Sequence, residues 1–150
     1  METPRILIVD DDDEVRAQMR WALAPRYDVL LADDRFSALE VLKKEAPDVV
    51  TLDLGLPPSP GDTREGFLAL SEMLQLNPLV KVLVITGQSE NENGVEAIGQ
   101  GAYDFLAKPV NVDELKVIID RAIHVQRLDR ERRELRPHRQ RRDRLRADGA

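Results

Sequence analysis

Five short runs of apolar, β-rich residues recur along the chain, separated by stretches whose apolar positions follow a helical spacing. The runs are Arg5–Val9, Tyr27–Leu31, Asp48–Leu52, Val80–Ile85 and Tyr103–Leu106. The fourth run contains Val82-Leu83-Val84-Ile85, which lacks the polar alternation of a half-exposed strand. Strand and helix patterns that alternate five times predict an α/β fold, a doubly wound parallel sheet of five strands with helices on both faces.

The stretches between these strands each present one apolar face. The expected faces are Val15, Met19, Ala22 and Leu23; Phe36, Leu39, Val41 and Leu42; and Phe67, Leu70, Met73 and Leu74. The last helix is expected to open at Asn111, because Glu114 stands three residues later at the spacing of a capping box.

Two segments are expected to be less regular. PPSPGDTREG, residues 57–66, is rich in Pro and Gly and predicts a loop, which we expect to be mobile over Pro58–Glu65. The helix expected between Gly87 and Gly101 contains Gly94 and Gly99. Each glycine costs about 1 kcal/mol relative to alanine inside a helix, so this helix is expected to be marginal and able to move.

The charge of the chain is unevenly distributed. The 150 residues carry a net charge of −6, but residues 1–120 hold 11 Lys and Arg against 23 Asp and Glu, whereas residues 121–150 hold 11 Arg against 5 acids. An acidic globule is a poor ligand for nucleic acid, so we expect no direct nucleic-acid binding. The chain has no cysteine and no apolar stretch of membrane-spanning length, which favours a cytoplasmic location without membrane contact.

Polar residues follow four of the predicted strands at the point where each strand ends. Asp10 and Asp11 follow the first strand, Asp53 the third, Thr86 the fourth and Lys108 the fifth. Ligands of doubly wound sheets bind outside the carboxyl ends of the strands, so these groups are expected to converge. Carboxylates at such an edge suit a hard divalent cation, Mg²⁺ above all, and the cation would explain why four consecutive aspartates, Asp10–Asp13, are tolerated.

Each of these residues also has an ordinary structural interpretation. Acids at Asp12, Asp13 and Glu14 favour the first turn of a helix, and Asp10 or Asp11 could be an N-cap. Taken alone, Asp53 is an ordinary turn residue and Lys108 an ordinary surface lysine. Only their joint placement at the ends of the right strands favours a functional site.

The motifs ILIVDDD, VVTLDLGLP, VLVITG and GAYDFLAKP together resemble the receiver domain of two-component response regulators, over about residues 4–124. The resemblance implies a CheY-like, flavodoxin-like sheet with strand order 2-1-3-4-5, five helices, and a cis peptide between Lys108 and Pro109. It also implies a signalling domain that catalyses only its own phosphorylation and dephosphorylation.

The resemblance also assigns roles to single residues. It implies that Asp53 is the phosphoacceptor and that Asp10, Asp11, Asp53 and the backbone carbonyl of Gly55 hold Mg²⁺. Lys108 would pair with the phosphoryl group, Thr86 would contact it through its hydroxyl, and Phe105 would be the aromatic residue that switches with Thr86.

A narrower resemblance is to the receivers of NtrC-type, sigma-54-dependent activators, and within them to the PEP-CTERM-system regulator. It implies a sensor histidine kinase as phosphodonor, a phosphorylation-biased dimer through the fourth helix, fifth strand and last helix, and ATPase and DNA-binding domains in full-length relatives. Receivers usually have Pro-x-x-Asp-Gly after the acceptor strand, whereas Gly66 comes nine residues after Pro57 here. The conformation of this loop is therefore not predicted.

Residues 125–150 are expected to extend the last helix and then to form a basic, disordered tail. Ile118, Val125, Leu128 and Leu135 fit a heptad seam whose two other core places hold Arg121 and Arg132, which makes the seam weak. Pro137 is expected to end the helix.

Three other interpretations compete with a phosphorylated receiver. An interaction module that keeps only the fold would have lost the acceptor, the acidic pair or the lysine, and none is lost. A haloacid-dehalogenase-like phosphatase needs a further signature after an Asp-x-Asp motif. A flavodoxin-like electron carrier needs a phosphate-cradling loop, where four aspartates would repel FMN.

Overall fold

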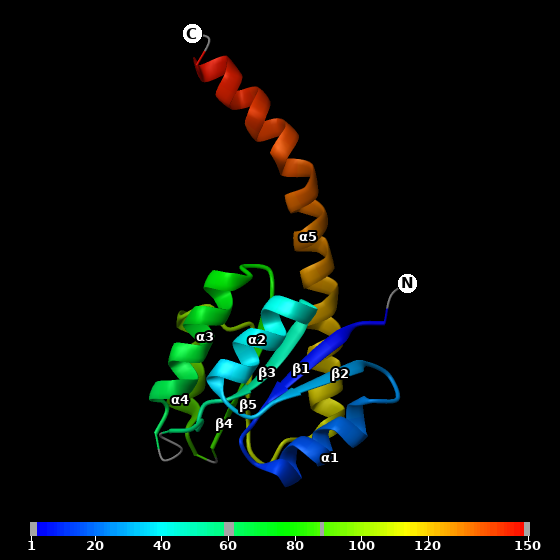
Figure 1. Cartoon of the computed structure of the whole chain (residues 1–150), viewed down its shortest axis with the longest axis vertical. Helices are drawn as coiled ribbons and strands as arrows, with labels where there is room; N and C mark the ends of the chain where they lie inside the picture. Colours follow the sequence, from blue (N-terminus) through cyan, green and yellow to red (C-terminus); the bar gives the residue numbers. More distant parts are fainter. Residues whose placement is uncertain (1–2, 59–61, 88, 149–150) are drawn as a thin grey trace.

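A five-stranded parallel sheet with the strand order β2-β1-β3-β4-β5 forms the centre of the computed structural model, as predicted (Figure 1). The structure describes residues 3–58, 62–87 and 89–148, with side chains as far as Leu135. The strands are β1 (Arg5–Val9), β2 (Asp28–Ala32), β3 (Val49–Asp53), β4 (Lys81–Thr86) and β5 (Asp104–Ala107). The helices are α1 (Asp13–Leu23), α2 (Arg35–Glu45), α3 (Arg64–Leu76), α4 (Asn91–Gly99) and α5 (Val112–Asp148).

Four of the strands begin and end one residue later than the sequence predicts. The shift matters at two places, because Asp53 and Thr86 become the last residues of β3 and β4 instead of the first residues beyond them. Register places Asp53 opposite Ile85, and Thr86 opposite Ala107, so the ends of β3, β4 and β5 lie together.

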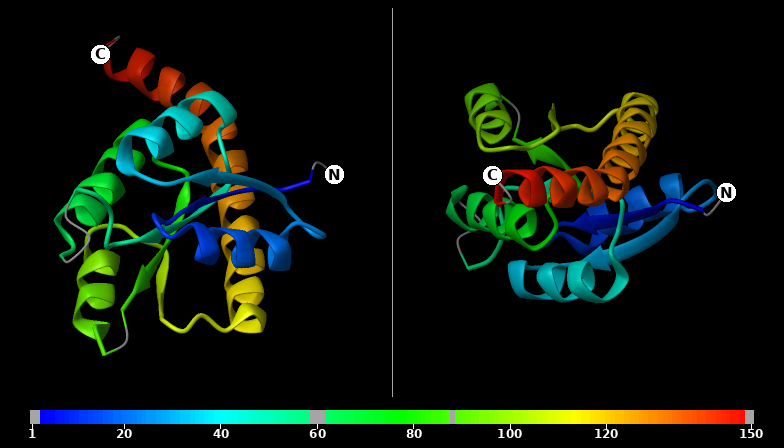
Figure 2. Two further views of the ribbon diagram at one scale, coloured as in Figure 1. Left: turned by 60° about the horizontal axis from the view of Figure 1, so that its bottom comes forward. Right: turned by 90° about the horizontal axis from the view of Figure 1, so that it is seen from above.

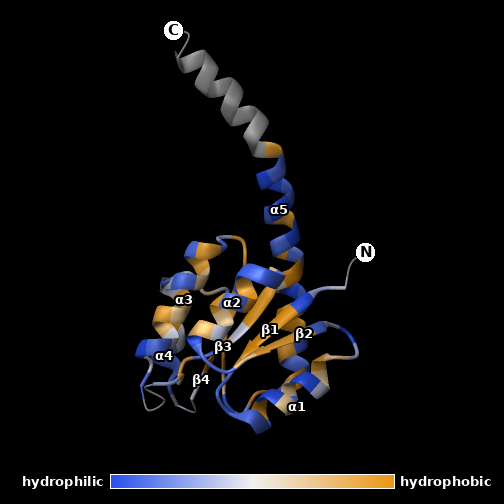
Figure 3. Ribbon diagram, viewed as in Figure 1, coloured by the Kyte–Doolittle hydropathy of each residue, from blue (hydrophilic) through white to orange (hydrophobic). Residues whose placement is uncertain are grey.

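Two apolar cores lie on opposite faces of the sheet. Successive side chains of a strand point to opposite faces, so alternate residues of β1 belong to different cores. Leu7 and Val9 lie in one core, and Ile6 and Ile8 lie in the other. The first core packs against α2, α3 and α4 and the second against α1 and α5. Figure 2 shows the two helical layers on either side of the strands, and Figure 3 shows the strands as the most hydrophobic part of the chain.

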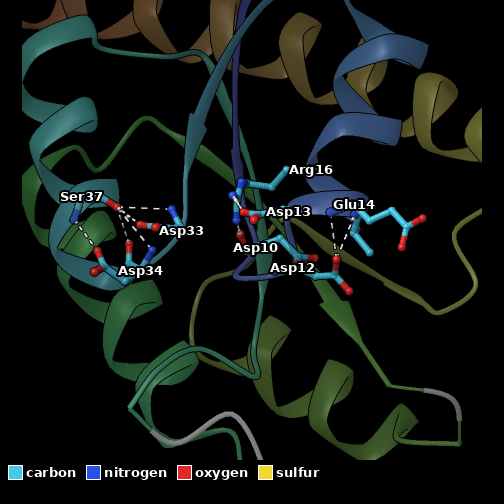
Figure 4. A network of polar contacts seen from close by, with 9 residues as sticks. Asp10, Asp12, Asp13, Glu14, Arg16, Asp33, Asp34 and Ser37 are labelled. Atoms are coloured by element: carbon cyan, nitrogen blue, oxygen red, sulfur yellow. Dashed lines mark hydrogen bonds and ion pairs between the residues drawn. The ribbon is translucent and has the colours of Figure 1, made fainter.

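Side-chain caps fix where three of the helices, α1, α2 and α5, begin at the carboxyl edge of the sheet. Asp12 caps α1, accepting hydrogen bonds from the N–H groups of Glu14 and Val15. Asp34 and Ser37 form a reciprocal capping box at the start of α2, and both caps are visible in Figure 4. Asn111 accepts a hydrogen bond from the Glu114 N–H at 3.0 Å, which confirms the predicted start of α5.

Two residues assigned to apolar faces lie elsewhere. Phe36 is 66% exposed and packs under the Arg35 guanidinium, and Ala38 with Leu42 forms the buried face of α2. Phe36 precedes Leu42 by six residues, which turns it about 120° away from that face. Ile118 is buried in the core of its own domain, so it is not available to the predicted heptad seam.

The last helix is longer than the sequence predicts. It runs from Val112 to Asp148 through Pro137, so the expected helix end at Pro137 is wrong. Proline kinks a helix as readily as it ends one, and the Arg, Leu and Gln residues around Pro137 have high helix propensity. The side chains of the predicted basic tail lie outside the described residues.

Ion pairs hold the first part of this extension against the amino edge of the sheet. Lys81, at the start of β4, pairs with Asp129 at 2.8 Å. Asp48, just before β3, pairs with Arg130 at 3.0 Å. Contacts between α5 and the sheet therefore reach Arg130, past the domain boundary predicted at residue 124. Figure 1 shows the rest of α5 projecting away from the globule.

The loop after β3 returns to the sheet at Gly66, in the first turn of α3. A Cβ atom at Gly66 would lie 2.4 Å from the Cα and carbonyl oxygen of Leu54. Backbone therefore packs on backbone here, which only glycine allows. Glu65 pairs with Arg35 of α2 at 2.9 Å, and both side chains are largely buried. The end of the loop is thus tied to two other elements, and its residues 59–61 lie outside the described part of the chain.

Among the described residues, no helix is both long and apolar enough to cross a membrane.

Replacing Gly66 with Ala should destabilise the fold by about 1–3 kcal/mol, because the new methyl group must displace the Leu54 backbone. Gly99→Ala is the matched control, since nothing lies within 4 Å of its Cβ position. It should stabilise α4 by up to about 1 kcal/mol. Chemical denaturation measures both changes, and equal effects of the two substitutions would contradict the close packing at Gly66.

Candidate functional site

Asp53 lies at the centre of the polar groups that follow the strands. Its side chain is buried at the end of β3. One carboxylate oxygen accepts the N–H of Gly55 at 3.1 Å, and the other accepts the ammonium group of Lys108 at 3.0 Å. Asp53 is therefore held in a fixed orientation by one backbone donor and one cation.

Asp10 and Asp11 face Asp53 from the end of β1. Each of the three residues offers a carboxylate oxygen within 4.8 Å of the others. Asp10 is buried, and its carboxylate accepts the Asp12 N–H at 2.9 Å, whereas Asp11 is exposed. Burial raises the pKa of Asp10 to about 6; the hydrogen bond from Asp12 opposes this rise, and the negative charge of Asp53 adds to it. Ionisation of Asp10 is therefore less favourable in the metal-free fold than in a freely exposed aspartate.

Lys108 supplies positive charge to this cluster. Burial alone would lower its pKa, but the hydrogen bond and charge of Asp53, with the charges of Asp10 and Asp11, outweigh burial and raise the pKa above its usual value. Its backbone is fixed too, because its N–H donates to the carbonyl of Thr86 at 2.9 Å. The Lys108–Pro109 peptide is cis, as the resemblance implied. Lys108 is therefore a fixed, fully charged ammonium beside three carboxylates.

Thr86 and Phe105 are near the site but turned away from it. The Thr86 hydroxyl is buried and donates to the carbonyl of Leu106 at 3.4 Å. The ring of Phe105 lies flat against α4, where a Cβ atom on Gly94 would come within 2.2 Å of it. Gly94, predicted only as a weak point of the helix, therefore makes room for the predicted switch residue.

A cavity of about 390 Å³ opens at this edge of the sheet. It is lined by Asp10, Asp11, Asp12, Asp53, Leu54, Gly55, Asp62, Thr63, Ile85, Gly87, Glu90 and Lys108. Asp62, Thr63 and Glu90 were missed by the sequence reasoning, although loops that leave the carboxyl edge of a parallel sheet surround the site. The loop after β3, whose role the sequence does not predict, thus contributes residues to the cavity.

A larger groove of about 1220 Å³ runs beside α1, past Trp21, which is 83% exposed. Its lining is mainly apolar and, among the described residues, brings together no cluster of carboxylates like the one at the sheet edge. The chemistry therefore belongs to the smaller cavity.

The donor set fits Mg²⁺. Mg²⁺ takes oxygen ligands and is commonly held by one or two carboxylates, with its other positions filled by water and phosphate oxygens. Asp10, Asp11 and Asp53 offer such oxygens on one side of the cavity, and the cation would relieve their mutual repulsion. Gly55 lines the same cavity, and the role of its carbonyl stays a prediction.

The structure also disfavours one rival reading. The Asp-x-Asp chemistry of haloacid-dehalogenase-like phosphatases would need the carboxylate of Asp12 beside that of Asp10. Asp12 instead directs an oxygen to the first turn of α1 as its N-cap (Figure 4).

Replacing Asp11 with Asn should stabilise the metal-free protein by about 0.5–1 kcal/mol after solvent screening, a rise in melting temperature of roughly 2–5 °C. Because the pKa of Asp10 is raised, protonated Asp10 favours the folded state, and this contribution to the stability of the fold is lost as the pH rises towards 6. The gain should therefore be larger at pH 7.5 than at pH 5. Melts in EDTA that show a lower midpoint for the variant at pH 7.5 would contradict the repulsion.

Comparison with known proteins places this chain in a family. Residues 6–120 match the response regulator receiver domain. The chain is 36% identical over 132 residues to the regulatory protein AtoC of Escherichia coli, covering 87% of this chain and 28% of that protein. It is 37% identical over 131 residues to the nitrogen assimilation regulatory protein NtrX of Azorhizobium caulinodans, with the same coverage. The chain thus spans less than a third of the length of these relatives.

Solved structures agree. The receiver domain of NtrX from Brucella abortus superposes with a TM-score of 0.73 at 35% identity, covering 79% of this chain and 98% of that one. NtrX from the same organism in complex with ADP gives a TM-score of 0.81 at 33% identity, covering 89% of this chain and 30% of the other. The narrower likeness to the PEP-CTERM-system regulator stays a prediction. The chain belongs to the response regulator receiver domain family and is similar to the receivers of NtrC-type, sigma-54-dependent regulators.

Proposed function

We propose that Asp53 accepts a phosphoryl group from a phosphohistidine of a sensor histidine kinase, in a reaction that requires Mg²⁺. One observation carries the proposal: the buried Asp53 carboxylate lies between the acidic pair Asp10 and Asp11 and the ammonium of Lys108, at the wall of an open cavity. On this account the chain is a signalling domain whose only chemistry is its own phosphorylation and dephosphorylation.

The residues of the site divide the work of phosphoryl transfer. An Asp53 oxygen forms a bond to phosphorus while the P–N bond of the donor breaks, and its electron pair stays on the imidazole. The ammonium of Lys108 lies close enough to Asp53 to stabilise the negative charge that builds on the phosphoryl oxygens during transfer. Asp10, Asp11, Asp53 and the Gly55 carbonyl would hold Mg²⁺, which would offset the negative charge of the donor group.

Incubation with Mg²⁺ and acetyl phosphate should add 80 Da, the mass of HPO₃, to the intact protein. The adduct should disappear in Asp53→Ala and in EDTA. Asp12→Asn is the matched control, because asparagine keeps the helix cap that Asp12 provides, and it should still be phosphorylated. An adduct that survives Asp53→Ala would place the phosphoacceptor elsewhere.

We propose further that Thr86 and Phe105 form the switch. The Thr86 hydroxyl makes a long hydrogen bond of 3.4 Å to Leu106, which a charged phosphoryl oxygen would readily replace. Movement of the hydroxyl towards Asp53 leaves space into which Phe105 can turn, away from Gly94. α4 is the element best able to respond, because it is short and its first turn has no side-chain cap.

The switch would act on a dimer formed through α4, β5 and α5. Val95 and Ile98 of α4 and Val117 of α5 are exposed apolar side chains on two of these elements. Leu128 and Leu135 are exposed on the extension and could lengthen the contact, whereas Ile118 cannot. A coupling of about 1–3 kcal/mol is usual for such switches, which corresponds to a roughly 5- to 150-fold change in dimer affinity.

Replacing Gly94 with Ala should mimic part of the switch. The new methyl group would overlap the ring of Phe105 and push it off α4, so the unphosphorylated variant should dimerise about fivefold or more tightly than the wild type. Sedimentation measures the dissociation constants, with Gly99→Ala as the control that adds a methyl group in open space. Unchanged dimerisation of Gly94→Ala would separate Phe105 from the dimer contact.

For a longer protein that contains this chain, we propose the output of its NtrC-type relatives: control of an ATPase and a DNA-binding domain, and through them of transcription. The support is similarity to AtoC and NtrX. The route would be α5, which begins beside the site and leaves the globule at the opposite edge of the sheet (Figure 1).

A further inference from the structure

A carboxylate from outside the aspartate cluster reaches into the cavity. Glu90, in the turn between β4 and α4, accepts the backbone N–H of Gly87 at 3.2 Å. The same carboxylate lies over the Gly87 Cα, since a Cβ atom there would meet it at 2.8–3.2 Å. Glycine at this position therefore lets Glu90 approach the backbone, although the outer side of Glu90 is exposed to solvent.

The Gly87 N–H is one of few donors at the wall of this cavity. Gly87 directly follows Thr86 at the end of β4, and it lines the cavity together with Asp53 and Lys108. Other lining residues with donors include Gly55, whose N–H is already bonded to Asp53, Lys108 with its ammonium, and Thr63 with its hydroxyl. A phosphoryl group on Asp53 has three terminal oxygens that accept hydrogen bonds, so the Gly87 N–H is a further donor that it could use besides Lys108 and Thr86. The Glu90 carboxylate now accepts this N–H.

We propose that Glu90 is a resident anion that holds the Gly87 N–H in the unphosphorylated protein and is displaced by the phosphoryl group of Asp53. The proposal rests on the phosphoacceptor role of Asp53. Glu90 acts here as a positioning residue: it makes no bond to the reacting atoms, and its charge and its hydrogen bond both oppose the arrival of a second anion.

Electrostatics sets the direction of the effect. Glu90 adds a fourth carboxylate to a cavity that already has Asp10, Asp11 and Asp53. Like charges that share a cavity repel each other, and the repulsion is weaker where solvent reaches them. A phosphoryl group that arrives at Asp53 must therefore overcome the repulsion of the Glu90 carboxylate and also replace it as the acceptor of the Gly87 N–H.

Displacement of Glu90 would also reach α4. Glu90 is the N-cap residue just before this helix: its N–H donates to the Gly87 carbonyl at 3.2 Å and its carbonyl accepts the Asn93 N–H at 3.1 Å. Its carboxylate accepts a hydrogen bond from the Gly87 N–H, so the first turn of α4 has no side-chain cap. Release of the carboxylate loosens one of two hydrogen bonds between Glu90 and Gly87, which couples the site to the helix that carries Gly94.

Beryllofluoride, an analogue of the phosphoryl group, tests the proposal at saturating Mg²⁺. Glu90→Gln keeps the shape of the side chain and removes its charge, and should bind beryllofluoride about threefold or more tightly than the wild type. Gly87→Ala removes no charge but evicts the carboxylate, and should give a similar gain. Glu92→Gln is the matched control, because it removes one exposed charge two residues further along and should change affinity less than threefold.

A second readout follows the Gly87 amide directly. The chain has 8 glycines, so protein labelled with ¹⁵N-glycine gives few amide signals in NMR spectra. The amide signal of Gly87 is identified by its loss in Gly87→Ala. It should differ between the wild type and Glu90→Gln in the free state and coincide once beryllofluoride is bound, because Glu90 has then left.

Two outcomes would overturn the role of Glu90: a gain under threefold in Glu90→Gln or Gly87→Ala, or an equal gain in Glu92→Gln. Gly87 signals that still differ in the bound state would do the same. Failure of the phosphoacceptor role looks different, because then the wild type would bind no beryllofluoride, or Asp53→Ala would bind it equally well.

Discussion

Mutual repulsion among the carboxylates of Asp10, Asp11 and Asp53 is the constraint around which this domain is arranged. Their oxygens lie within 4.8 Å of one another, and the one ammonium paired with them among the described residues, that of Lys108, balances only part of their charge. Burial is the main cause of the raised pKa of Asp10, and the charges of Asp53 and Asp11 add to it. A cluster with excess negative charge and open oxygens is poised for a divalent cation, and the cation in turn makes an anionic phosphoryl group acceptable at Asp53.

The parallel sheet is what brings these groups together. Residues 10, 53, 86 and 108 are far apart in the sequence, yet each lies at the carboxyl end of a strand, and register places those ends side by side. The same strands link the site to the surface. The Thr86 hydroxyl contacts the carbonyl of Leu106, and next to Leu106 the ring of Phe105 rests on Gly94. A change at Asp53 therefore has a short path of packed groups to α4, and Glu90 offers a second path through the turn that begins this helix.

The sequence predicts the parts of the site that follow directly from strand ends. Asp10, Asp53 and Lys108 could be placed because a buried strand has a recognisable apolar run and its end is a fixed point. Asp62, Thr63 and Glu90 could not, since they lie in loops without a repeating pattern and reach the cavity only through the path of the chain. Phe36 and Ile118 were misplaced because hydrophobicity alone does not say which neighbour a side chain meets. Gly94 was recognised as a helix weakness, but its role depends on a ring that is distant in the sequence and close in space.

Binding of Mg²⁺ by the metal-free protein tests the central claim most directly, because it needs neither kinase nor phosphodonor. Calorimetric titration should show one ion per chain in the wild type and an affinity about tenfold or more lower in Asp11→Asn, which loses a charged ligand. The carboxylate of Asp12 caps α1, so Asp12→Asn should lower the Mg²⁺ affinity by less than about threefold. Equal losses in the two variants, or no binding by the wild type at millimolar Mg²⁺, would contradict the assignment of this cluster as the metal site of a receiver domain.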